Sequence, residues 1–301
     1  MIICKENTLA LKGLCILIIV AHHYAQNFGF LPDFLRGFGA IGCAVFFFIS
    51  GYGLTKGPGD FKKWKNRFFR LYLPFFIANS LYLLYFIFWE KRSFGLLSGT
   101  KYLIGIPMTN IHWFIQVLLI LYFAGFVTDT IFKSSNYWFC CLSILLGGAY
   151  SCATLTPGSI SWIAFPLGIL CAKYSFENVN KCFSVIVFII LSLMTFYIYH
   201  YIGDGYLNNM LLLLNFLLMC ISVPFVFLYI GDMISNSRVL KMIGKFSIDI
   251  YFAHFIAIFF LCDFSLDGFS LLFFFTLLVI IATAVFLNLK NIISALLFPV
   301  K

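Results

Sequence analysis

The stretch that decides the fold reads LKGLCILIIVAHH at residues 11–23 and GFGAIGCAVFFFISGYG at residues 37–53. Each lies in an apolar run long enough to cross a bilayer as a helix, which takes about 20 residues. The first run carries Lys12, His22 and His23 among apolar side chains. Because lipid does not solvate charge, ionisable residues at this depth indicate a functional site. We therefore expect the rest of the chain to house these two helices.

The composition places the whole chain in a membrane. Of its 301 residues, 62% are hydrophobic and 10% are charged, and the mean hydropathy is +1.01. A soluble globular domain has about 45–50% apolar and about 25% charged residues. The composition excludes a soluble protein and leaves room for roughly ten spans with short connections. We predict an all-α, polytopic transmembrane helical bundle that forms a single domain over residues 1–301, with no separate soluble domain.

The predicted spans follow the apolar runs. A secretory signal is the alternative interpretation of the first run, but no small-residue cleavage site follows it and the chain continues into a second apolar stretch. We therefore interpret the first run as a retained helix. The sequence TLTPGS at 154–159 interrupts the region of the fifth and sixth spans. The expected spans lie near residues 8–28, 38–56, 71–89, 113–132, 137–153, 159–172, 183–201, 208–230, 246–262 and 269–289.

The distribution of Lys and Arg predicts the orientation, because cytoplasmic loops are enriched in these residues. With the N-terminus inside, most of the 20 basic residues fall in inner segments, and the exceptions are Arg36, Lys91, Arg92 and Lys101. Both termini are therefore predicted to be cytoplasmic in a multi-pass cell-membrane protein. The formal net charge of +9 reflects this topology and an attraction to anionic lipids or anionic cytosolic ligands, with no nucleic acid partner.

The ten cysteines do not indicate disulfides or a metal site. Most of them lie within apolar runs and show no paired CxxC spacing, so we interpret them as small core residues. The chain also lacks a P-loop, a GxGxxG motif and a metal-ligand cluster. No metal cofactor is expected.

The spacing of Lys12 and His23 places both on one stripe of the first helix. Eleven residues at about 100° and 1.5 Å each separate them by roughly 16 Å along the axis. Lys12 is then near the cytoplasmic interface and His23 near the middle of the membrane. Histidine accepts and returns a proton near neutral pH, which makes His23 a candidate general base. A structural histidine that forms a hydrogen bond between helices explains this residue equally well.

The second helix and the following inner segment carry two further candidate features. Ser50 and Gly51 would allow close approach of another helix or a loosened backbone beside a cavity, and close packing alone also explains them. In FKKWKNRFFRLYLP at 61–74, Arg67 and Arg70 are three residues apart and share one face of a helix. Paired arginines hold phosphate groups bidentately. Ordinary anchoring of a cytoplasmic loop accounts for the lysines but not for this pair.

These features together resemble the acyltransferase 3 family of integral membrane acyltransferases. The family's first helix reads Arg-x10-His, and Lys12 to His23 has that spacing. GCAVFFFISGY at 42–52 resembles the family's second helix. Residues 67–74 resemble the RxxRxxP-like motif of the family's first cytoplasmic loop.

Two later segments agree with the resemblance. NIHWFIQ at 110–116 resembles the family's HLWF segment, and IGKFSIDIYFAH at 243–254 resembles its late SxxxYxxH-type segment. In the latter, Ser247, Tyr251 and His254 fall on one helical face. We interpret that face as an interhelical hydrogen-bonding stripe in preference to a catalytic one.

The resemblance implies an activity and roles for individual residues. Such proteins move an acyl group, usually acetyl, from cytosolic acyl-CoA to a hydroxyl of a cell-envelope polysaccharide or lipid-linked sugar. His23 is implied as the proton acceptor, and Arg67 and Arg70 as ligands of the coenzyme A phosphates. Ser50 and Gly51 are implied to line the path of the acyl chain. The expected location is the bacterial cytoplasmic membrane, in contact with membrane lipids.

The remaining expectations concern the substrate and an alternative function. Lys12 is an expected substrate contact, although it stands where the family has arginine and so lacks the planar fork. His112 and Trp113 are expected at the outer interface, where the resemblance implies substrate contacts and anchoring at the membrane surface explains them equally well. The chain resembles the stand-alone type, without a soluble esterase-like domain, and a homo-oligomer stays open. The alternative is a transporter or export component for a polysaccharide or small solute, in which His22 and His23 gate a proton or sugar path without acyl transfer.

Overall fold

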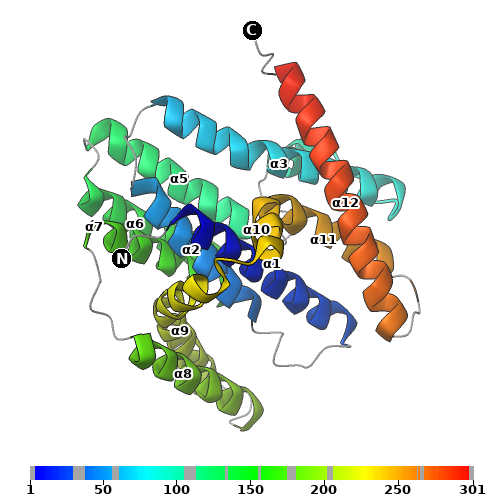
Figure 1. Ribbon diagram of the computed structural model, residues 1–301. Helices are drawn as coiled ribbons and strands as arrows, with labels where there is room; N and C mark the ends of the chain where they lie inside the picture. The colour runs from blue at the N-terminus through cyan, green and yellow to red at the C-terminus, as the bar shows by residue number, and fades with distance from the viewer. Residues whose placement is uncertain are drawn as a thin grey trace.

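The chain folds into a bundle of helices, with no strand in the part that the structure describes (Figure 1). The computed structural model describes residues 4–29, 38–55, 61–104, 113–132, 135–154, 157–174, 181–201, 206–262, 264 and 268–297. The predicted all-α fold class is confirmed. The helices are α1 (Lys5–Phe28), α2 (Phe38–Thr55), α3 (Phe61–Phe88), α4 (Leu96–Leu103), α5 (Trp113–Ile131), α6 (Asn136–Thr154), the 3-10 helix η3 (Pro157–Ile163), α7 (Ala164–Lys173), α8 (Lys181–Tyr201), α9 (Tyr206–Ile234), α10 (Arg238–Lys245), α11 (Ser247–Leu261) and α12 (Gly268–Leu297).

The helices in the described residues do not reproduce the predicted count of ten membrane spans. Every expected span contains helix, but within the described residues six helices are long and apolar enough to cross, or seven if the bent pair α10 and α11 counts as one. A break in the helical backbone shortens the sixth predicted span. The chain enters α7 through η3, and α7 has 10 residues, or about 15 Å of helix against a hydrocarbon core of about 30 Å.

Helix α2 lies inside the bundle and is buried along most of its length. It packs on α1, α5, α7 and α9. Its closest approach is to α7, because a Cβ added to Gly51 would collide with the carbonyl oxygen of Phe165, and one added to Gly168 would collide with that of Phe48. Two glycines therefore let these backbones touch, as small residues do in membrane bundles.

The short helix α10 lies across α1 in a similarly close contact. A Cβ at Gly13 would collide with the carbonyl oxygen of Leu240, and one at Gly244 with that of Leu9. Immediately afterwards the chain bends by 75° between α10 and α11. This bend brings the end of α10 and the start of α11 against the first half of α1.

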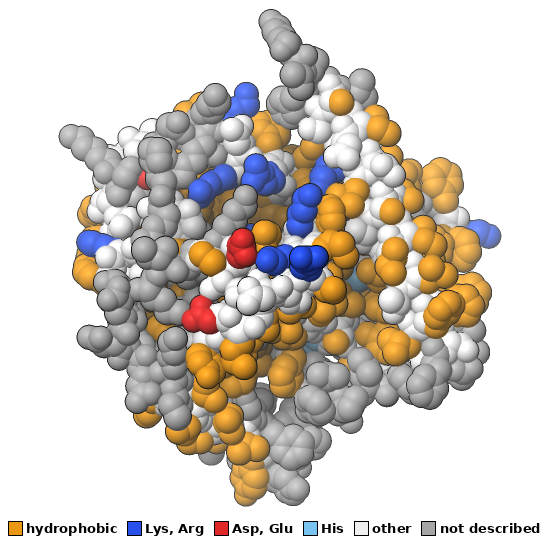
Figure 2. Space-filling model, in the orientation of Figure 1, with side chains coloured by type: hydrophobic (Ala, Val, Ile, Leu, Met, Phe, Trp, Pro, Cys, Tyr) orange, Lys and Arg blue, Asp and Glu red, His pale blue; other side chains and the backbone are white. Residues whose placement is uncertain are grey.

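Polar contacts join the ends that the charge pattern assigns to the cytoplasmic side. The side-chain amide of Asn7 on α1 donates to Asp232 on α9 over 2.8 Å. The ammonium group of Lys241 on α10 lies 3.1 Å from the carboxylate of Glu6 on α1. Figure 2 shows Lys and Arg side chains gathered across the middle and upper part of this face. The side of the membrane to which the face belongs stays a prediction.

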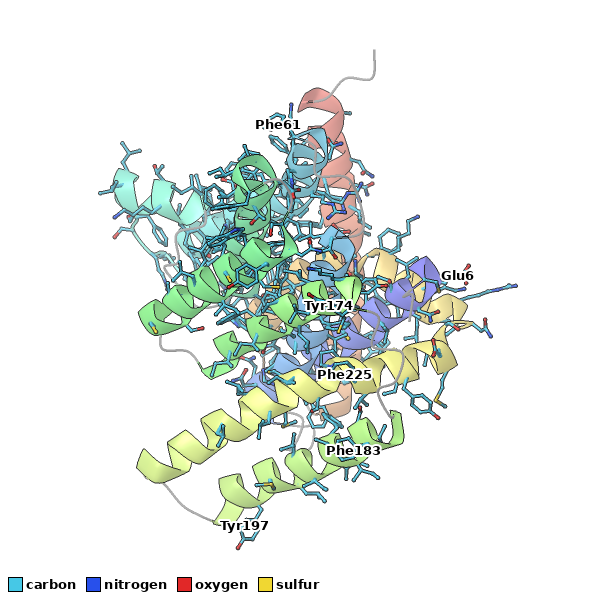
Figure 3. The ribbon with its side chains drawn as sticks, turned by 90° about the vertical axis from the view of Figure 1, so that its left-hand side faces the viewer. Glu6, Phe61, Tyr174, Phe183, Tyr197 and Phe225 are labelled. Atoms are coloured by element: carbon cyan, nitrogen blue, oxygen red, sulfur yellow. The ribbon has the colours of Figure 1, made fainter. Side chains whose placement is uncertain are left out.

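The outer helices expose apolar side chains. Helix α8 packs on α9 along one edge of the bundle (Figure 3). Its side chains Phe183 and Tyr197 are 64% and 58% exposed, and Phe273 and Ile280 of α12 are exposed to a similar degree. Apolar surface of this extent marks contact with lipid or with another protein. In a chain of this composition it is the lipid-facing surface.

Candidate active site

A basic cavity of about 390 Å³ lies among α1, α2, α3, α5 and the α10–α11 bend. Four cationic side chains line it, Lys12, Arg67, Arg70 and Lys245, and none of its lining residues is acidic. We call this space the basic cavity. Such a concentration of positive charge without a carboxylate suits a polyanionic ligand.

Helical spacing places three of these cations in the cavity. Lys12 lies on the face of α1 that also presents Ile16 to the cavity, one turn further along. Arg67 and Arg70 line the cavity together from α3, which confirms that they share a face. One guanidinium nitrogen of Arg67 also donates to the carbonyl oxygen of Gly53 over 3.2 Å. This bond fixes Arg67 to the end of α2, whereas Arg70 is exposed.

Lys245 reaches the cavity from the end of α10. The sequence analysis quoted the segment that contains it but gave this lysine no role. Its position depends on the contact of Gly13 with α10 and on the bend after it. The sequence did contain a signal for Lys245, because this lysine lies in the family-like segment at 243–254. Ser247 and Tyr251 of the same segment also line the cavity.

The walls of the cavity change from polar to apolar along its length. The hydroxyl groups of Ser50 of α2 and Tyr122 of α5 make the lining polar near the arginines. One turn away on the same helices lie Phe46 and Leu118, both cavity-lining residues. Because α2 runs antiparallel to α1, with Gly39 against His22, this apolar part lies toward the histidines. Nothing in the sequence distinguished Tyr122 from the other tyrosines of the predicted spans.

His23 faces α11 and is separated from the basic cavity by other side chains. Its ring lies 5.3 Å from that of His254 in a stacked arrangement and 4.7 Å from that of Phe255, measured between ring centroids. His254 in turn lies 5.7 Å from the ring of Tyr251, which lines the cavity. His23 is not among the lining residues. Tyr251 and His254 therefore stand between the cavity and His23.

The other predicted site residues lie in different surroundings. Gly51 contacts the backbone of α7 at Phe165 and is not among the residues that line the cavity. Trp113 packs against the rings of Phe47 and Phe114, at centroid distances of 6.3 Å and 6.2 Å. His112 lies outside the described residues. The structure thus brings together Lys12, Ser50, Arg67 and Arg70 in one cavity, and it places His23 beyond that cavity.

With this geometry in place, the chain can be compared with known proteins. Residues 10–289 match the model of an acyltransferase family, described as the acyltransferase domain. The chain belongs to this family. No curated protein and no solved structure matches the chain. The predicted resemblance is therefore confirmed over nearly the whole chain.

Membership makes the chain a membrane acyltransferase, which needs an acyl donor. The match begins before Lys12 and ends after His254, so the basic cavity and the stacked histidines both lie within the acyltransferase domain. Within the described residues, no group of three or more His, Cys, Asp or Glu side chains is arranged to hold a metal ion.

Proposed function

We propose that this acyltransferase transfers an acyl group, most simply acetyl, from acyl-CoA to a hydroxyl of a cell-envelope polysaccharide or lipid-linked sugar. The observation that carries the proposal is the convergence of Lys12, Arg67, Arg70 and Lys245 on one cavity in a chain of this family. Coenzyme A is a polyanion with a long neutral arm, and its shape fits the change in the cavity from basic to apolar.

The donor side is assigned from the charges. Arg67 and Arg70 offer planar forks that bind phosphate oxygens bidentately, while Lys12 and Lys245 supply point charges. Because α3 holds both arginines on one face, a diphosphate can contact both at once. Ser50 then lies beside the neutral arm, at the point where the lining becomes apolar. Gly51 does not line the cavity. We propose that it shapes the acyl path indirectly, by letting α2 pack closely on α7.

The chemical step needs one base. As the acceptor hydroxyl oxygen forms a bond to the thioester carbonyl carbon, His23 takes the hydroxyl proton, and the carbon–sulfur bond breaks. The coenzyme A thiolate then receives a proton from the imidazolium, which leaves the acyl ester, free coenzyme A and neutral His23. A buried, positioned imidazole of this kind typically contributes 10²–10⁴-fold to the rate.

The separation of His23 from the cavity imposes a condition on this reaction. The thioester must pass Tyr251, whose ring lies 5.5 Å from that of Phe114 at the apolar part of the cavity. We propose that a rotation of the Tyr251 side chain joins the cavity to the histidines. The acceptor would approach from the opposite side, where Trp113 begins α5 and where His112 precedes it in sequence. We therefore propose that the donor enters from the cytoplasmic side and the acceptor from the outer side of the bacterial cytoplasmic membrane.

The test uses purified protein in lipid vesicles with acetyl-CoA as the donor. The wild-type protein should consume acetyl-CoA and add acetyl to an acceptor sugar, whereas a transporter would do neither. His23→Ala should abolish transfer, because no other group is proposed to take the hydroxyl proton. Its membrane level and its binding of acetyl-CoA should stay normal, which separates the loss of a base from loss of the fold. Retained transfer in His23→Ala would refute the assignment of the base.

A further inference from the structure

His254 is a fully buried histidine with only one of its ring nitrogens in use. It is 0% exposed, and its Nδ1 lies 3.2 Å from the carbonyl oxygen of Ile250. A carbonyl oxygen only accepts hydrogen bonds, so Nδ1 carries the proton. In a neutral imidazole the other nitrogen, Nε2, is then an acceptor with a free lone pair.

That acceptor has no hydrogen-bond partner in the part of the chain that the structure describes. Buried polar atoms are nearly always paired, so an exception in a native fold calls for an explanation, of which a catalytic or ligand-binding role is one. The surroundings support such a role here. The His254 ring stacks on that of His23, with an interplanar angle of 29°, and lies next to Tyr251 at the cavity. The free lone pair therefore sits on a ring between the proposed base and the donor site.

We propose that Nε2 of His254 accepts a hydrogen bond from a second hydroxyl of the acyl acceptor, adjacent to the hydroxyl that His23 deprotonates. The inference rests on the proposed function and names the substrate class as a vicinal diol, as found in carbohydrates. The rings of His23 and His254 stack with their centroids 5.3 Å apart, so two neighbouring hydroxyls of one acceptor would each meet one imidazole. A site built to bind a hydroxyl discriminates strongly against analogues that lack it.

The experiment compares two acceptors that differ in this feature. Octyl β-glucoside carries vicinal hydroxyls on an apolar tail, and 2-octyloxyethanol carries a single hydroxyl on a similar tail. Full-length protein in lipid nanodiscs receives acetyl-CoA and either acceptor, and mass spectrometry measures the acetylated product. The wild-type protein should prefer octyl β-glucoside.

Three variants test the role of the nitrogen. His254→Phe keeps a ring that stacks on His23 but removes the acceptor atom, and should raise KM for octyl β-glucoside about tenfold and abolish the preference. Its KM for acetyl-CoA should not change. His254→Gln restores an acceptor at similar reach and should recover most of the preference. Ser143→Ala is the matched control, because Ser143 Oγ is also buried without a partner among the described residues but lies on α6, which packs on α5 and α7.

Two results would overturn the proposal. One is a His254→Phe protein that keeps the wild-type preference, and the other is an equal rise of KM for both substrates, which indicates a purely structural role. If wild-type protein forms no acetylated product from either acceptor, the proposed function fails for these probes. In that event, fluorescence titration with octyl β-glucoside decides the role of His254 alone: weaker binding by His254→Phe supports it, and equal binding refutes it.

Discussion

Replacing Arg70 with Gln should weaken the binding of acetyl-CoA with little effect on the chemical step. Arg70 lines the basic cavity and is exposed, whereas Arg67 is also bonded to the carbonyl oxygen of Gly53. Arg70 is therefore the cleaner test of phosphate binding. A hydrogen bond to a charged group contributes about 1.5–3 kcal/mol, and about 1.4 kcal/mol corresponds to a factor of ten in affinity. Since solvent screens an exposed arginine, we expect the lower end, an increase in KM of about tenfold.

The assay is steady-state transfer at several salt concentrations, with acetyl-CoA varied at a saturating acceptor concentration. Loss of a cation that contacts phosphate should raise KM, leave kcat near the wild-type value and make KM less sensitive to salt. Arg238→Gln is the matched control, because Arg238 is an exposed arginine of α10 that does not line the cavity. It removes the same charge and should leave KM within about twofold of the wild type.

A second donor identifies the phosphate that Arg70 contacts. With acetyl-3′-dephospho-CoA, the penalty of Arg70→Gln should vanish if the arginine binds the 3′-phosphate and persist if it binds the diphosphate. The reasoning is refuted if Arg70→Gln leaves KM for acetyl-CoA unchanged, or if Arg238→Gln raises it equally, since the cavity would then have no special role.

Two further predictions concern stability. Gly244→Ala should lower the melting temperature of the detergent-solubilised protein, because its Cβ would collide with the carbonyl oxygen of Leu9 and overpacking costs about 1–3 kcal/mol. Gly148→Ala is the control and should not lower it, because its Cβ would meet nothing within 4 Å. Equal effects of the two substitutions would contradict the close-packing argument. Lys290→Met removes the ion-pair partner of Asp249, which is 2% exposed. The substitution should lower the free energy of unfolding by about 2 kcal/mol. This is less than for a fully buried pair, because the Lys290 side chain is 24% exposed. Adding Asp249→Asn should restore part of the thermal stability, and a double variant no more stable than Lys290→Met would argue against the ion pair.

Several features of the site followed from local sequence. A spacing of three put Arg67 and Arg70 on one face of α3, and both line the cavity. The same periodicity placed Tyr251 and His254 together on α11. These predictions held because the side-chain direction in a helix is set by residue number, whatever the helix packs against.

Other features depended on contacts between distant segments. The cavity role of Lys245 depends on α10 crossing α1 at Gly13. Gly51 was expected beside the acyl path, but α2 and α7 approach so closely that it contacts Phe165. The separation of His23 from the cavity requires the ring of Tyr251 to lie between them. No spacing along the chain encodes which helices meet.

By itself, the sequence determined that this protein is a helical membrane acyltransferase, because composition, apolar runs and five ordered motifs are properties of the chain alone. Only the tertiary structure decided the number of helices long enough to cross the membrane, the fourth cation of the cavity and the pairing of His23 with His254. The physical reason is that apolar burial drives helices together without direction, whereas shape complementarity between particular residues selects the partner and register of each helix.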